Sequence, residues 1–227
     1  MSPPLVIAHR GASGYEVENS LAAFRRAARL GADGVELDVH ASADGVLFVH
    51  HDPVIPPGHR IAALPQSALR RLTLANGEPI PTLTEALAVA GRLRVFIEVK
   101  GLEPRFDEHL LRVIDGGPNP IGYAVHSFDH GIIRRLGALR PALSRGVLAS
   151  ADAVDPLAAL EETGADTLWQ ERALVDRALV DRVPRIRRRI VVWTVDRPEE
   201  MPRLLALGVD GLCTNRPDVA RRVVDAS

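Results

Sequence analysis

Residues Ala8–Asp52 read AHRGASGYEVENSLAAFRRAARLGADGVELDVHASADGVLFVHHD and combine turn glycines, a helical stripe and two acids one residue apart. The acids are Glu36 and Asp38, and they lie in Gly34–Val39, which has the pattern of a strand. Side chains two residues apart on a strand point to the same face, so both carboxylates share one side of the sheet. Two acids in an apolar interior repel each other unless a cation or a shared proton is present. A bound metal ion is the simplest answer.

Strands and helices are expected to alternate along the chain. We expect a first strand at Leu5–His9, then a helix that begins after an Asn19 N-cap and ends at Gly31. Strands follow at Gly34–Val39, Val46–His50, Arg94–Val99, Gly122–His126, Ser144–Leu148, Asp166–Trp169, Ile190–Val195 and Gly208–Thr214, and helices at Gln66–Leu74, Thr84–Ala90, Asp129–Leu139, Pro156–Glu162, Ala173–Val183 and Glu199–Leu207 and after Pro217. This alternation implies right-handed βαβ units and a parallel sheet. We therefore predict an α/β protein, a (β/α)₈ TIM barrel, which fits 227 residues.

Residues 52–83 interrupt the alternation, because six prolines break any long element there. We predict a small insertion after the second strand that lies over the barrel mouth. It is too small to have a core of its own, so one domain over residues 1–227 is expected.

Composition excludes several classes of partner. The formal net charge of −1 argues against nucleic acid, and no stretch of eighteen uncharged apolar residues could cross a bilayer. We therefore expect no nucleic-acid partner and no stable membrane anchor. The single Cys213 excludes an internal disulfide framework, and MSPPLVIAHRG lacks the features of a signal peptide. A cytoplasmic location is the expectation.

Polar residues gather where the predicted strands end. A (β/α)₈ barrel builds its active site at the C-terminal ends of its strands. The polar and aromatic residues at these ends are His9, Glu36, Asp38, Glu98, Lys100, His126, Trp169, Trp193 and Asn215.

The three carboxylates Glu36, Asp38 and Glu98 supply hard oxygen ligands, which favour Mg²⁺ or Ca²⁺. The alternative is that they form ion pairs with Arg10 and Lys100 at the barrel mouth, and we favour the metal. A metal ion with these two cations makes a positive pocket suited to the oxygens of a phosphate ester.

Two histidines can exchange protons near neutral pH, and the pair His9 and His51 suits phosphodiester cleavage. One imidazole would activate the nucleophile while the other protonates the leaving alkoxide. His51 is preferred over His50, because neighbouring residues of an extended segment face opposite ways. His40 either supports the site or has no role. His126 either contacts the substrate or is a rim histidine whose ring is satisfied by its surroundings, and we favour the second interpretation.

Eight short motifs resemble one known family along nearly the whole chain. They are His9-Arg10-Gly11, Glu18-Asn19-Ser20, Glu36-Leu37-Asp38-Val39, Asp44-Gly45, His51-Asp52, Glu98-Val99-Lys100, Trp193-Thr194-Val195 and Thr214-Asn215-Arg216-Pro217. Together they resemble the signature of the glycerophosphodiester phosphodiesterases. The resemblance implies a TIM barrel with a small insertion after the second strand. It also implies a divalent cation and hydrolysis of a small-molecule glycerophosphodiester to glycerol 3-phosphate and an alcohol.

Carried over position by position, the resemblance assigns a role to each motif residue. It implies acid/base catalysis by His9 and His51, metal binding by Glu36, Asp38 and Glu98, phosphate contacts by Arg10 and Lys100, help with the metal or site orientation by Glu18, and a pocket wall at Trp193. Glu18 comes from the resemblance alone.

Two other functions stay open at this point. One is a lysophospholipase D-like phosphodiesterase that acts on lysophospholipids, and the other is a non-catalytic barrel that binds a phosphate head group. The segment Pro53–Pro57 departs from the Leu and Arg-Thr-Thr stretch frequent in the family, and we expect it to line the alcohol side of the pocket.

Overall fold

The computed structural model describes residues 3–150, 155–183 and 188–227. Within these ranges, eight parallel strands close into a barrel: β1 (Leu5–Ala8), β2 (Gly34–Ala41), β6 (Arg94–Gly101), β7 (Tyr123–Ser127), β8 (Ser144–Ala149), β9 (Thr167–Glu171), β10 (Arg189–Trp193) and β11 (Gly211–Thr214). Each strand pairs with the next, and β1 pairs with both β11 and β2, which completes the ring. The predicted TIM barrel is confirmed.

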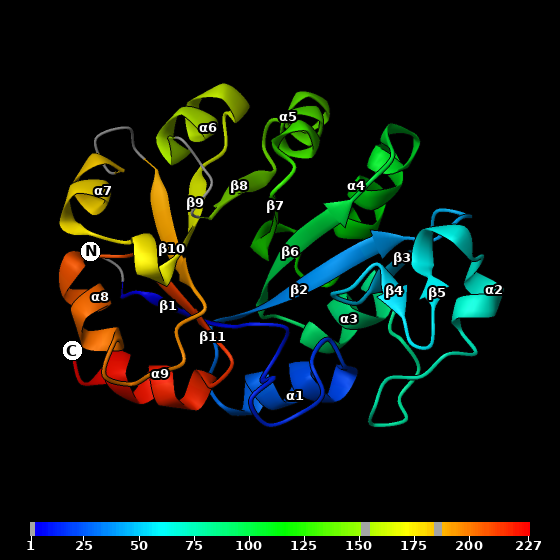
Figure 1. Cartoon of the computed structure of the whole chain (residues 1–227), viewed down its shortest axis with the longest axis horizontal. Coiled ribbons are helices and arrows are strands. Elements are labelled where there is room, and N and C mark those ends of the chain that lie inside the picture. Colours follow the sequence, from blue (N-terminus) through cyan, green and yellow to red (C-terminus); the bar gives the residue numbers. More distant parts are fainter. Residues whose placement is uncertain (1–2, 151–154, 184–187) are drawn as a thin grey trace.

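Helices surround the strands, as Figure 1 shows. Those outside the segment 52–83 are α1 (Leu21–Arg29), α3 (Leu83–Ala90), α4 (Asp107–Asp115), α5 (His130–Leu139), α6 (Pro156–Thr163), α7 (Arg177–Arg182), α8 (Met201–Leu207) and α9 (Pro217–Asp225). The main apolar core lies between these helices and the outer face of the strands. None of the described helices has the length and apolar character that a membrane crossing needs.

The inside of the barrel is divided between an apolar part and a polar part. Five buried side chains from β1 and from β8 to β11 pack together there: Ile7, Leu148, Trp169, Val191 and Cys213. By contrast, β2, β6 and β7 bury polar side chains, namely Glu36, Asp38, Glu98 and His126. Because side chains alternate along a strand, acids two residues apart on β2 lie on the same side. The division places the charged groups of the barrel on three neighbouring strands.

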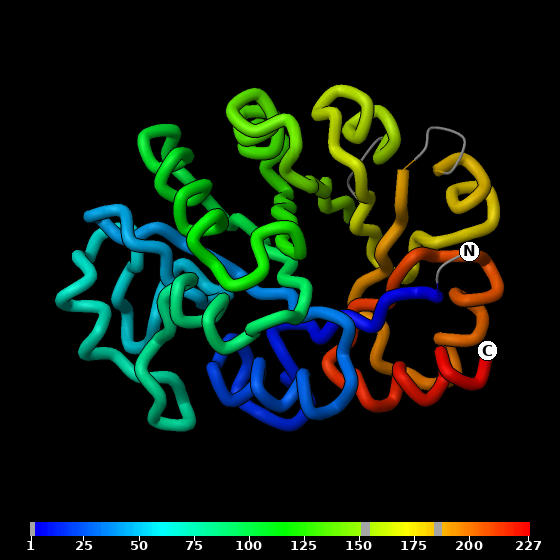
Figure 2. Tube along the Cα trace, turned by 180° about the vertical axis from the view of Figure 1, so that it is seen from behind, coloured from blue at the N-terminus to red at the C-terminus, as the bar shows by residue number. Residues whose placement is uncertain are grey.

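The predicted insertion after the second strand is present, and it contains a small extra sheet that the sequence did not predict. Strand β3 (Leu47–Val49) runs antiparallel to β2, and β4 (Val54–Ile55) pairs with β5 (His59–Arg60) before α2 (Gln66–Leu69). With Phe48 of β3, the segment buries Ile55, Ile61, Leu69 and Ile80 in a cluster separate from the main core, so the expectation that the insertion has no core of its own is wrong. Figures 1 and 2 show it to one side of the ring of helices, near α3.

Four helix expectations need correction, and the first is Gln66–Leu74, where α2 already ends at Leu69. The N-cap of α1 is Ser20, whose hydroxyl accepts the Ala23 N–H, and not Asn19. The helix expected at Ala173–Val183 is a 3₁₀ turn followed by α7, because Asp176 caps a new start. Helix α4 was not expected, although three buried leucine and isoleucine residues mark its inner face.

Candidate active site

One cavity opens at the C-terminal ends of the barrel strands. It is lined by charged, imidazole and aromatic side chains together with two smaller apolar residues: His9, Arg10, Glu36, His51, Glu98, Lys100, His126, Phe128, Leu148, Trp169, Trp193 and Cys213. Most of the predicted site residues are therefore brought together. The exceptions are Asp38 and Glu18, which contact Arg10 from outside the lining. No described residue of 52–83 lines the cavity. The cavity lining therefore does not support the expectation that Pro53–Pro57 borders the alcohol side of the pocket.

Three carboxylates lie next to one another on β2 and β6. Glu98 is the strand neighbour of Asp38, and Glu36 is two residues before it, and all three are buried. Burial, followed by repulsion from Asp38 and Glu98, raises the pKa of Glu36 well above its usual value. Burial and then Asp38 raise the pKa of Glu98 to about 7. Both acids therefore hold a proton more tightly than a free carboxyl does, and Glu98 does so even with Lys100 Nζ 2.7 Å from its Oε1 atom.

Asp38 differs from these two acids because cations already surround it. Lys100 Nζ lies 3.0 Å from Asp38 Oδ1 and 2.7 Å from Glu98 Oε1, and Arg10 Nε lies 3.3 Å from Asp38 Oδ2. Burial opposes ionisation, but Lys100 and Arg10 outweigh it and hold the pKa of Asp38 at about 2. The sequence offered two interpretations of Asp38, a metal ligand or a partner in ion pairs with Arg10 and Lys100. The structure contains both ion pairs. Arg10 Nη1 is also 2.9 Å from both carboxylate oxygens of Glu18.

Backbone strain occurs at the same site. Arg10 and Asn19, with φ of 55° and 56°, are the non-glycine residues of the described chain that have left-handed φ angles. This conformation lets the Arg10 N–H donate to Glu36 Oε2 at 3.0 Å. Asn19 Nδ2 donates to Asp38 Oδ2 at 2.8 Å. Sequence reasoning missed this role of Asn19, although the residue stands within a recognised motif.

A buried group of three side chains can hold a metal ion. One ligand atom each from Glu36, Glu98 and His126 lies within 4.8 Å of the others. Two hard carboxylates that repel each other fit a divalent cation, because the cation would offset their repulsion. The third donor is an imidazole nitrogen, which the oxygen-only set predicted from the sequence did not contain. Asp38 is outside this group of three.

His126 departs from the sequence interpretation. The ring is buried, stacks on Trp169 with centroids 4.1 Å apart, and places Nε2 3.8 Å from Glu36 Oε1. Its Nδ1 has no hydrogen-bond partner among the described residues, so the expected satisfied rim histidine is wrong. Burial lowers the pKa of His126 to about 3, which keeps the ring neutral and able to bind a cation.

The two predicted acid/base histidines both line the cavity. His9 directly follows β1, and its Nδ1 lies 2.8 Å from Asn215 Oδ1. Burial, followed by the neighbouring Arg10 charge, lowers the pKa of His9. His51 follows β3 on the other side, where its Nδ1 lies 2.8 Å from Asp52 Oδ1.

Neighbouring histidines take different positions around His51. His50 directs Nδ1 to the Asp52 carbonyl at 2.8 Å and is not among the residues that line the cavity. His40 places Nε2 3.0 Å from the His51 carbonyl oxygen. Of the two roles left open for His40, this contact supports the one in which it holds the backbone of His51.

An aromatic pair forms a wall of the cavity. Trp193 ends β10, and its ring meets that of Phe128 edge-on with centroids 5.8 Å apart. Phe128 is 48% exposed, which is unusual for so large an apolar side chain. Sequence reasoning expected Trp193 as a wall but missed Phe128, which lies just beyond β7 and carries no charge to mark it.

The sequence profile of the glycerophosphoryl diester phosphodiesterase family matches residues 9–219. This chain belongs to that family. A glycerophosphodiester phosphodiesterase of Caldanaerobacter subterraneus is 33% identical over 236 residues, which cover 97% of either chain. The predicted family and enzyme class, a hydrolase that acts on phosphodiesters, are confirmed.

Solved structures of the family superimpose on nearly the whole chain. A glycerophosphodiester phosphodiesterase from Parabacteroides distasonis is 27% identical with a TM-score of 0.89, covering 99% of this chain and 98% of that one. An Oleispira antarctica phosphodiesterase is 26% identical with a TM-score of 0.90, covering 98% and 97%. That second enzyme was solved in complex with its product sn-glycerol-3-phosphate.

Proposed function

We propose that this phosphodiesterase hydrolyses glycerophosphodiesters to glycerol 3-phosphate and an alcohol, with a divalent cation bound and with His9 and His51 exchanging protons. The observation that carries the proposal is one cavity lined by two buried carboxylates, Glu36 and Glu98, and by the imidazoles of His9 and His51. A site that only binds phosphate needs no pair of proton-exchanging groups. The product complex of the Oleispira antarctica relative supports the choice of substrate.

Glu36, Glu98 and His126 would hold the cation, and Asp38 would contribute through its contacts with Lys100 and Arg10. When bound, a divalent cation offsets the negative charge of the phosphodiester and stabilises the charge that develops at phosphorus. Mg²⁺ and Ca²⁺ prefer oxygen ligands, whereas an imidazole nitrogen also suits Mn²⁺ and its neighbours in the first transition row. An assay that compares Mg²⁺, Ca²⁺ and Mn²⁺ therefore distinguishes these preferences.

The chain's own residues supply charge and proton transfer. Arg10 and Lys100 line the cavity and would contact the non-bridging phosphate oxygens. One imidazole takes the proton of the attacking oxygen while the other gives a proton to the leaving alcohol oxygen. The Phe128–Trp193 wall excludes water from one side of the cavity and offers an apolar surface to the carbon skeleton of the substrate.

Chelation tests the proposed cation. Protein dialysed against EDTA is assayed with glycerophosphocholine by coupled detection of glycerol 3-phosphate, before and after addition of Mg²⁺, Ca²⁺ or Mn²⁺. We expect turnover to disappear and then return with at least one ion. Glu36→Gln should raise the cation concentration needed for half-maximal activity, whereas Glu103→Gln, an exposed acid beyond β6, should not. Undiminished turnover after exhaustive chelation would contradict the proposed cation.

The same assay separates the competing functions. Faster cleavage of lysophosphatidylcholine than of glycerophosphocholine would favour the lysophospholipase D-like function. Glycerol 3-phosphate affinity in calorimetry, with no hydrolysis of any diester, would favour the non-catalytic barrel.

A further inference from the structure

Two side chains outside the predicted catalytic pair hold the ring of His9. His9 Nδ1 lies 2.8 Å from Asn215 Oδ1, and Asn215 Nδ2 lies 2.6 Å from Asp196 Oδ2. Barrel closure makes this contact possible, because β1 and β11 are parallel neighbours that place Ala8 beside Thr214. The residues that follow these two strands therefore face each other across 206 positions of sequence.

Asp196 fixes which way the Asn215 amide points. The Asp196 Oδ1 atom accepts the backbone N–H of Asn215 at 2.8 Å and the hydroxyl of Thr214 at 3.0 Å. A carboxylate accepts hydrogen bonds and has none to donate, so the Oδ2 atom must face the amide NH₂ group of Asn215. The carbonyl oxygen of the Asn215 side chain is thereby left to face His9.

This orientation determines the tautomer of His9. The Asn215 Oδ1 atom can only accept, so the His9 Nδ1 atom must carry a hydrogen. The Ser13 hydroxyl lies 2.7 Å from this oxygen and 2.7 Å from the His9 carbonyl oxygen, and its single hydrogen can be donated to one of the two at a time. A neutral His9 ring therefore has its lone pair on Nε2. Because the ring lines the cavity, that nitrogen is the one available to accept a proton there.

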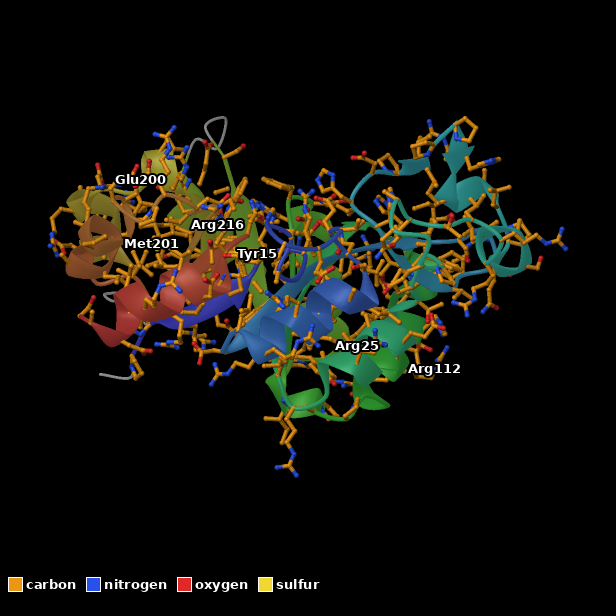
Figure 3. The ribbon with its side chains drawn as sticks, turned by 90° about the horizontal axis from the view of Figure 1, so that it is seen from below. Tyr15, Arg25, Arg112, Glu200, Met201 and Arg216 are labelled. Carbon is orange, nitrogen blue, oxygen red and sulfur yellow. The ribbon has the colours of Figure 1, made fainter. Side chains whose placement is uncertain are left out.

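The two loops that carry these residues pack against each other. The Gly14 N–H donates to the Asn215 carbonyl at 2.9 Å, and a Cβ at Gly14 would come within 2.8 Å of the same oxygen. Next to it, the Tyr15 hydroxyl donates to Asp218 Oδ1 at 2.6 Å. Figure 3 shows Tyr15 beside Arg216. The packing leaves little freedom for the His9 loop to move relative to Asn215.

We propose that Asp196 and Asn215 are positioning residues that hold His9 as the proton acceptor of the reaction and leave His51 as the proton donor. The proposal rests on the proposed function. The attacking O–H gives its proton to His9 Nε2 as the new O–P bond forms. The P–O bond to the alcohol breaks with its electron pair, and that oxygen takes a proton from His51. Proton exchange with water then returns both rings to their starting forms.

The surroundings of His9 agree with the role of proton acceptor. Burial, followed by the neighbouring Arg10 charge, lowers the pKa of His9 and so favours the neutral ring, although the Asn215 hydrogen bond and the Asp38 and Glu18 charges act the other way. His51, the other histidine of the predicted pair that lines the cavity, is then left as the proton donor.

Asp196→Asn tests the positioning directly. Its side-chain oxygen would stay with the Asn215 N–H and the Thr214 hydroxyl, so its NH₂ group would face Asn215. Two NH₂ groups repel, and the Asn215 amide is then expected to rotate and present its own NH₂ group to His9. The His9 tautomer should change to Nε2–H, which cannot accept the proton.

Two readouts follow this change. Two-bond ¹H–¹⁵N spectra of histidine-labelled protein report the tautomer, with the His9 signal identified by its loss in His9→Gln. We expect the Nδ1 and Nε2 shifts to exchange in Asp196→Asn. Turnover of glycerophosphocholine, measured with saturating cation, should fall about 10²- to 10⁴-fold, the range of general acid–base catalysis.

Exchanging the side chains of positions 196 and 215 should restore the His9 tautomer. In Asp196→Asn combined with Asn215→Asp, the new amide donates to the new carboxylate, which accepts the His9 Nδ1–H again. The double variant should regain the wild-type tautomer, whereas turnover should recover only in part, because the new carboxylate favours the protonated His9 ring. The matched control is Asp166→Asn, because Asp166 also accepts a hydroxyl and a backbone N–H but lies at the start of β9. Its turnover should equal that of the wild type.

The outcomes separate this proposal from the proposed function. An unchanged tautomer in Asp196→Asn, or a changed tautomer with full turnover, would overturn the positioning role. Failure of the double variant to recover the tautomer would overturn it as well. If the wild type cleaves no diester, the proposed function fails, whereas the spectra still show whether Asp196 and Asn215 set the His9 tautomer.

Discussion

On the β1 side of the cavity, His9 donates its Nδ1–H to a neutral amide that is fixed by two further side chains, Asp196 and Ser13. On the β3 side, His51 contacts the adjacent Asp52, and both side chains are open to water, with 35% and 68% of their surface exposed. The β1 side is thus built from contacts between distant strands, whereas the β3 side depends on neighbours in sequence. The difference indicates that a buried network can set the direction of proton transfer, while an exposed pair is easily supplied with protons by water.

Replacement of each histidine in turn should have the largest effect on turnover and should show whether the two rings have different roles. Both His9→Ala and His51→Ala are expected to lower turnover of glycerophosphocholine about 10²- to 10⁴-fold. With a p-nitrophenyl ester of glycerol phosphate, the leaving phenolate needs no proton. We therefore expect His51→Ala to recover most of its activity on that ester, and His9→Ala to recover none.

His50→Ala is the matched control, because it removes the same ring one position earlier, outside the residues that line the cavity. It should leave the turnover of both esters near that of the wild type. Recovery of His9→Ala in place of His51→Ala would show that the two roles are reversed.

The pH dependence of stability should differ between the buried acid Glu98 and the exposed pair of His51 and Asp52. Without a cation, the folded pKa of Glu98 is about 7 and its unfolded value is 4.5. Because the folded state holds the proton more tightly, stability falls as pH rises from 4.5 to 7, by about 3 kcal/mol in total. Urea unfolding in EDTA should therefore find Glu98→Gln more stable than the wild type above pH 7, with the gap closing toward pH 4.5.

On the exposed side, Asp52→Asn is the comparison for this measurement. Its carboxylate pairs with His51 in contact with water, where such pairs contribute less than about 1 kcal/mol. Its unfolding free energy should follow that of the wild type closely across the same pH range. A gap between Glu98→Gln and the wild type that does not vary with pH would mean that Glu98 ionises normally in the folded protein.

Local sequence patterns predicted the strands and the residues that end them. Side-chain alternation was enough to place Glu36 and Asp38 on one face, and the barrel rule brought His9 and Glu98 to the same rim. These features depend on contacts within a strand or between strands whose order the fold dictates. The prolines were enough to place the insertion after β2, but not to predict its small sheet or its separate apolar cluster.

The supports of the site were harder to predict because they arise only when the barrel closes. Asp196 has no motif of its own, and Asn215 gains its role from a ring 206 residues away. His126 looked ordinary because its stacking on Trp169 and its closeness to Glu36 join three different strands. Ion pairing of Asp38 with two cations likewise follows from register between β2 and β6 and from the turn after β1.

The smallest expected effect concerns a side-chain contact that holds the backbone on the β3 side. His40 holds the His51 carbonyl through Nε2 at 3.0 Å, and burial lowers the pKa of His40, so a neutral ring can serve as the donor. Loss of one such hydrogen bond costs about 1 kcal/mol, so His40→Leu should lower turnover of glycerophosphocholine about fivefold. His40→Gln keeps a donor and should lose less. The p-nitrophenyl ester should be cleaved by His40→Leu at nearly the wild-type rate, since it does not need a proton from His51. An equal loss on both esters would mean that His40 supports the whole site and not the donor alone.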